Sequence, residues 1–223
     1  MTDNATTKAP IHAKPRGGGF PLGAWVRANA VGLGVAYGLF ALLGDAVEHW
    51  GGAPHDSIAR NAAIMSALLI GAAVFVLMRR NVLAPHLGGA GRTAVAAGVG
   101  LAVGLTTGFM VAGPPFDFVF GVATLGTIGG ALQWRLVKDR LSRPGGLFLA
   151  GAAAWLAAAV AVLAVALFAG DLIFAALGQP DDASAVGFMS YVAFLTLLGV
   201  VGGAVGGAIE GAALRRRMDH ATP

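Results

Sequence analysis

The chain has 223 residues, of which 57% are hydrophobic and 12% are charged, and its net charge at pH 7 is +4. Soluble domains carry about 25% charged residues, so this composition excludes an ordinary soluble protein and indicates an integral membrane protein. The absence of cysteine from the sequence excludes disulfides, thiolate metal sites and cysteine nucleophiles. The basic residues lie in short clusters beside apolar segments, a pattern typical of membrane topology signals rather than of nucleic-acid binding.

The chain begins with residues 1–22, which are polar and basic and contain prolines but no apolar run. We expect a disordered basic cytosolic tail here rather than a cleaved signal peptide. Residues 23–214 are expected to form a transmembrane domain, and residues 215–223 a short basic cytosolic tail. A spanning helix needs about 20 apolar residues. The segments that meet this requirement are approximately residues 26–44, 58–78, 93–113, 116–134, 147–169 and 188–210.

The predicted fold is therefore all-α, a bundle of six transmembrane helices. Its orientation follows from the positive-inside rule, which counts Lys and Arg in short loops. If the N-terminus is inside, every Lys and Arg except Arg60 falls on the inner side, and the outer loops carry mostly acidic residues. We predict that both termini are cytosolic and that the chain lies in a bacterial inner (plasma) membrane.

Internal similarity predicts three helical-hairpin repeats within this bundle. The second, fourth and sixth spans each carry a glycine at a fixed distance before a basic residue, and GGALQ (129–133) aligns with GGAIE (206–210). The pattern GxGxxxG occurs in the first span at 32–38 and in the third at 98–104. Because each hairpin would start inside, the repeats are expected to be parallel.

Glycine is abundant, with 35 residues, and many of these glycines are four positions apart. In lipid, small residues at this spacing let helix backbones approach closely. The bulkiest side chains concentrate in the outer halves of the spans, which predicts helices that converge toward the cytosol around an outward-facing cavity. The glycines expected to pack helices together are Gly34, Gly38, Gly100, Gly104, Gly126, Gly130, Gly199, Gly203 and Gly207.

Two polar groups are candidates for chemistry. The first is an outer cluster in which carboxylates and imidazoles could bind a divalent cation or exchange protons. The alternative, which we favour, is a solvated acidic loop. The cluster consists of Asp45, Glu48, His49, His55 and Asp56. The second is an inner polar layer in which Glu210 pairs with Arg27 beside Gln133 to form a gate. The alternative is that these side chains simply reach water at the interface.

The sequence contains no GxxxxGK[ST], GxSxG or HExxH motif, so we expect neither an enzyme nor a cofactor. Two functions remain open. One is a small transporter or channel-like protein with an outward-facing cavity. The other is a non-catalytic accessory or scaffold subunit that packs through its glycine ridges against a second copy or a larger membrane complex. Beyond the lipid bilayer, no partner is predicted by name. Ridges that face into the bundle would favour the first function, and ridges that face outward would favour the second.

Overall fold

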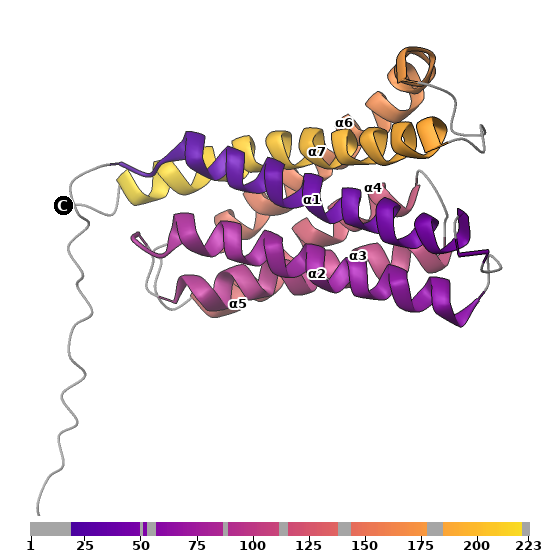
Figure 1. Cartoon of the computed structure of the whole chain (residues 1–223). Helices are drawn as coiled ribbons and strands as arrows, with labels where there is room; N and C mark the ends of the chain where they lie inside the picture. Colours follow the sequence, from indigo (N-terminus) through magenta and orange to yellow (C-terminus); the bar gives the residue numbers. More distant parts are fainter. Residues whose placement is uncertain are drawn as a thin grey trace, which may run out of the picture.

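The computed structural model describes residues 19–49, 51–52, 57–86, 89–111, 116–137, 144–177 and 185–219. Within these ranges the chain is almost entirely helical and has no strand, which confirms the all-α prediction (Figure 1). The elements in order are α1 (Leu22–His49), α2 (Ile58–Leu83), α3 (Ala90–Val111), α4 (Phe116–Thr124), the π-helical turn η1 (Leu125–Gly129), α5 (Gly130–Val137), α6 (Pro144–Leu177) and α7 (Ala185–Asp219).

The helices are arranged as a closed ring. α4, η1 and α5 follow one another without a break and form one rod over residues 116–137. α1 packs against α2 and α7, α3 packs against α2 and the rod, and α6 packs against the rod and α7. α1, α2, α3 and α7 run roughly along one direction, whereas α6 is tilted against them and its last turns stand away from the bundle (Figure 1). The centre of the ring is therefore enclosed by side chains from every helix.

Four helices within the described ranges are long and apolar enough to cross a membrane, and they indicate a membrane-embedded protein. The outer surface agrees with this, because large apolar side chains of α6, such as Leu156, Val160 and Phe168, are exposed. An apolar surface this extensive needs a lipid or protein cover. The four segments are Leu22–Gly44, Ile58–Leu83, Phe148–Ala176 and Ala185–Arg217.

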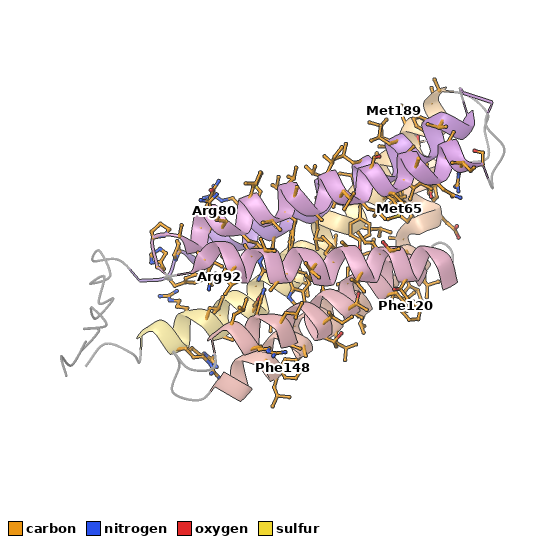
Figure 2. All side chains as sticks on the ribbon, turned by 90° about the horizontal axis from the view of Figure 1, so that it is seen from below. Met65, Arg80, Arg92, Phe120, Phe148 and Met189 are labelled. Carbon is orange, nitrogen blue, oxygen red and sulfur yellow. The ribbon has the colours of Figure 1, made fainter. Side chains whose placement is uncertain are left out.

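One end of the ring is basic. α1 begins there, α2 and α7 end there, and Arg80 and Arg92 lie near it, whereas Met65 and Met189 lie toward the other end (Figure 2). We call this the basic end. α7 continues in helical conformation through Arg215–Arg217 to Asp219, so the predicted tail over 215–223 begins as part of the last helix.

The glycines of α7 make room for α1. A Cβ atom added to Gly199 would lie 2.6 Å from the carbonyl oxygen of Leu33, and one added to Gly207 would lie 2.9 Å from Asn29 Cβ. Real Cβ atoms essentially never come within 3.0 Å of another heavy atom. Both positions therefore require glycine for α1 and α7 to approach this closely, and both face into the bundle.

The remaining predicted glycines lie at contacts between neighbouring elements, with one exception. Gly100 of α3 meets Gly129 of the rod, where an added Cβ would lie 2.6 Å from the Gly129 Cα. Gly130 differs because the nearest atom to its added Cβ is 3.6 Å away, an ordinary contact that would tolerate a methyl group. The tight positions are Gly34 and Gly38 against α7, Gly104 against the rod, Gly126 against α6, and Gly203 against α1.

The half of the ring away from the basic end is packed rather than open. Phe40, Phe194 and Leu198 are buried there in one apolar cluster. Phe174 joins them, with its ring centroid 4.6 Å from that of Phe194. The predicted outward-facing cavity rested on the assumption that bulky side chains hold the helices apart. Among the described residues, Phe40 and Phe194 instead fill the space between the helices, and Phe168 points outward.

Candidate functional site

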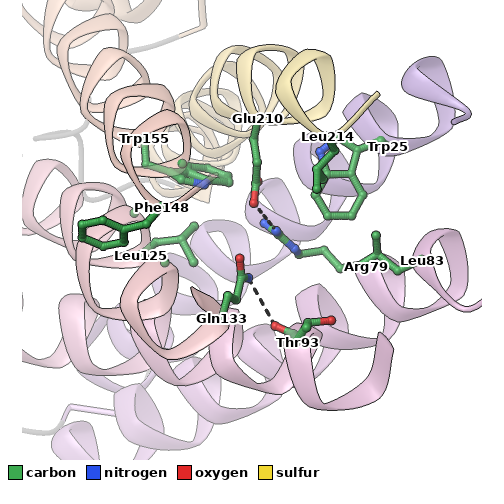
Figure 3. A pocket seen from close by; sticks show the side chains of 13 residues that line it. Trp25, Arg79, Leu83, Thr93, Leu125, Gln133, Phe148, Trp155, Glu210 and Leu214 are labelled. Atoms are coloured by element: carbon green, nitrogen blue, oxygen red, sulfur yellow. Dashed lines mark hydrogen bonds and ion pairs between the residues drawn. The ribbon is translucent and has the colours of Figure 1, made fainter. Parts of the chain in front are cut away.

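The site is built around an ion pair that crosses the ring. Arg79 of α2 is 1% exposed, and its Nη2 donates to Glu210 Oε1 of α7 at 2.7 Å (Figure 3). Its Nη1 donates to Asn29 Oδ1 of α1 at 2.9 Å. The Asn29 amide nitrogen donates in turn to the carbonyl oxygen of Trp25 at 2.8 Å, which directs the Asn29 oxygen toward Arg79. Three helices are thus joined through one guanidinium group.

Aromatic rings surround this guanidinium. Its Cζ lies 4.3 Å from the centroid of the Trp25 ring, 5.2 Å from that of Phe75 and 5.9 Å from that of Trp155. Trp25 and Asn29 are four residues apart on α1, as are Phe75 and Arg79 on α2, so each pair lies on one helix face. Cation–π attraction of this kind is strongest where water is excluded.

Glycines of α7 allow this cluster to form. Gly206 lies against Trp155, where an added Cβ would be 2.6 Å from a ring carbon, and Gly207 lies against Asn29. Glu210 follows one helical turn later and extends from the same helix into the ring (Figure 3). The glycine ridge and the ion pair therefore form one structural unit.

A partly enclosed pocket of about 40 Å³ lies beside the ion pair, on the side of α3, the rod and α6. Leu125, Phe148 and Trp155 form apolar walls (Figure 3). Gln133 lies opposite Glu210, and its Nε2 donates to the backbone carbonyl of Thr93 at 3.2 Å. The space is large enough for about three water molecules, at roughly 10–15 Å³ each.

Two polar atoms of the ion pair have no hydrogen-bond partner among the described residues. They are Glu210 Oε2 and Arg79 Nε, and both are buried in side chains that line the pocket. Leaving a buried polar group unsatisfied costs about 1–3 kcal/mol, more when it is charged. The ion pair therefore retains one unused acceptor and one unused donor, in two side chains that line the pocket.

The structure brings Gln133 and Glu210 to the same pocket but gives Glu210 a different partner from the one predicted. Arg27 is exposed and lines a shallow groove between α1 and α2 together with Met78 and Asn81. The reason is helical geometry, because two residues along a helix turn the side chain by about 200°. Trp25 faces inward, so Arg27 faces outward, and the predicted Glu210–Arg27 pair is wrong.

Sequence reasoning missed Arg79, which it assigned to the topology signal formed with Arg80. Both arginines end an apolar helix, but Arg79 points into the ring and Arg80 is exposed. One residue of α1 did indicate a buried polar partner on another helix. Asn29 carries an amide inside an apolar span, and this amide is buried. A buried amide of this kind needs a polar partner from another helix.

The outer acidic cluster lies outside what the structure describes. This holds for the side chains of Asp45, Glu48 and His49 and for residues His55 and Asp56. Among the described residues, no group of three or more His, Asp or Glu side chains could hold a metal ion.

Comparison with known proteins adds no homologue. No protein-family model matches the chain, and neither a curated protein nor a solved structure is significantly similar to it. The function must therefore be argued from the ion pair and its pocket.

Proposed function

We propose that the chain is a six-span membrane protein that passes a small solute, with the Arg79–Glu210 pair closing its basic end. The observation that carries this proposal is a buried ion pair that joins α2 to α7 across the centre of a helix ring, beside a partly enclosed pocket. Charged side chains inside membrane helices are costly, and they commonly mark solute or proton pathways. Separating α2 from α7 would open the pocket to the basic end.

Six spans are supported by the length of the two elements that are not among the four long apolar segments. α3 has 22 residues, and the rod covers residues 116–137. At 1.5 Å per residue each is about 33 Å long, enough for a hydrocarbon core of about 30 Å. Both elements also complete the ring. With the basic end in the cytosol, both termini would be cytosolic and the chain would form three hairpins.

Single-cysteine variants test this topology directly. The wild-type chain has no cysteine, so no native cysteine has to be removed first. We expect an impermeant maleimide applied from outside the cell to label Ser57→Cys and Ala112→Cys, but not Arg92→Cys or Arg216→Cys. Position 112 decides the span count, because it follows α3 and would be inside if only the four long helices crossed the membrane. Labelling of Ala112→Cys only after permeabilisation would contradict six spans.

The accessory or scaffold alternative loses its main support. This alternative predicted that the glycine ridges contact a partner protein. Gly199, Gly203 and Gly207 instead pack against α1 of the same chain. By the criterion set from the sequence, ridges that face into the bundle favour a solute pathway.

Liposomes containing the purified protein provide the functional test. We expect them to equilibrate small solutes faster than protein-free liposomes, as measured by stopped-flow light scattering. Glu210→Gln removes the charge that holds Arg79 and should increase the rate several-fold. Asn81→Leu, on the exposed side of α2, is the control and should behave as wild type. Rates equal to those of protein-free liposomes for wild type and Glu210→Gln alike would refute the pathway.

A further inference from the structure

Two side chains that carry hydrogen-bond acceptors, Gln133 and Glu210, line the pocket. Glu210 Oε1 is occupied by Arg79, which leaves the buried Oε2 without a partner among the described residues. The Gln133 amide N–H donates a hydrogen bond to the backbone carbonyl oxygen of Thr93, and the amide oxygen points toward Glu210 (Figure 3). A ligand that bridges these two oxygens must supply at least two N–H or O–H donors.

The charge in the pocket is balanced before any ligand enters. Glu210 and Arg79 neutralise each other at 2.7 Å, in side chains that are 6% and 1% exposed. A cation would add a positive charge beside the guanidinium and would have no lone pair to offer Arg79 Nε. An anion would have no donor for the two oxygens.

Size and wall chemistry limit the ligand further. The cavity of about 40 Å³ admits a molecule of only a few heavy atoms. Trp155, Phe148 and Leu125 provide flat or apolar walls. Small-molecule sites typically combine such walls with a few convergent polar groups, as Glu210, Gln133 and Arg79 do here.

On the basis of the proposed solute pathway, we propose that its pocket selects a small uncharged molecule that both donates and accepts hydrogen bonds, of the urea or carboxamide class. The N–H groups of such a molecule would reach Glu210 Oε2 and Gln133 Oε1. Its carbonyl oxygen would accept from Arg79 Nε. This arrangement would satisfy both unpartnered atoms of the ion pair at once.

Three planar molecules of similar size and different charge test the proposal: urea, guanidinium and nitrate. Their entry into liposomes containing the full chain would be followed by rapid filtration and chemical assay of the trapped solute. Potassium and valinomycin would carry the balancing charge for the two ions. We expect urea to cross fastest relative to protein-free liposomes. Gln133→Leu should slow urea about tenfold, the size of effect expected for one lost hydrogen bond.

The controls separate this inference from the proposed function. Asn81→Leu makes the same amide-to-leucine change outside the ring and should leave urea entry unchanged. Gln133→Asn keeps the amide but shortens it, and should give an intermediate rate even if Gln133→Leu folds poorly. If guanidinium or nitrate crosses fastest, the pathway stands and the neutral-solute inference is overturned. If none of the three crosses faster than in protein-free liposomes, both are overturned.

Discussion

Glu210→Ala is expected to lower the free energy of unfolding by about 3–5 kcal/mol, because it leaves the Arg79 guanidinium buried without its counter-charge. The measurement is equilibrium unfolding in mixed micelles of dodecyl maltoside and sodium dodecyl sulfate. Tryptophan fluorescence reports directly on the site, since the Trp25 and Trp155 rings lie within 6 Å of the guanidinium carbon.

The double variant Arg79→Met/Glu210→Leu provides the matched comparison. Replacing both members of a buried ion pair by apolar side chains of similar volume is often nearly neutral. We therefore expect the double variant to be more stable than Glu210→Ala and to retain the ring. The single variants Arg79→Met and Glu210→Leu complete the cycle. If their two effects simply add in the double variant, the pair is not coupled as described.

The second large effect is expected at Gly203, where α7 touches the backbone of α1. A Cβ atom here would lie 2.7 Å from the Cα of Ala30, and backbone cannot move aside as a side chain can. Gly203→Ala should therefore cost about 1–3 kcal/mol by overpacking. The same micelle unfolding experiment measures it.

Gly151 of α6 is the matched control for Gly203. An added Cβ at Gly151 meets nothing within 4 Å. Gly151→Ala should then be neutral or stabilise the protein by up to about 1 kcal/mol, because alanine favours the helix over glycine. The two substitutions are chemically identical and differ only in what the new methyl group meets. Equal effects from both would contradict the close approach of α1 and α7.

Apolar segments and glycine spacing were sufficient to predict an all-helical bundle, because both depend on local composition. The positions of single side chains around each helix were harder to predict. Gln133 and Glu210 were recognised as polar residues at matched positions, and both line the pocket. Arg79, the partner of Glu210, was not recognised. Arg79 and Arg80 are adjacent in the sequence, and only the packing of α2 determines which of them points inward.

The packed half of the ring was also unpredictable from residue size alone. A bulky side chain can separate two helices or fill the space between them, and the choice depends on the facing helix. Tyr37 illustrates this, because its buried ring packs against the bare backbone at Gly199, where a Cβ would lie 2.8 Å from a ring carbon. The sequence showed both residues but not that they meet. The π-helical turn at Leu125–Gly129 had no sequence signal that we used.

Cross-linking α2 to α7 at the basic end tests the central claim that these helices must separate for solute to pass. Leu83 and Leu214 come from these two helices and line the same pocket. The variant Leu83→Cys/Leu214→Cys would be joined by a reducible bismaleimide, with the two single-cysteine variants as controls. We expect the cross-link to reduce urea entry to the level of protein-free liposomes, and we expect chemical reduction of the cross-linker to restore it. Urea entry that is unchanged in the cross-linked protein would contradict the central claim.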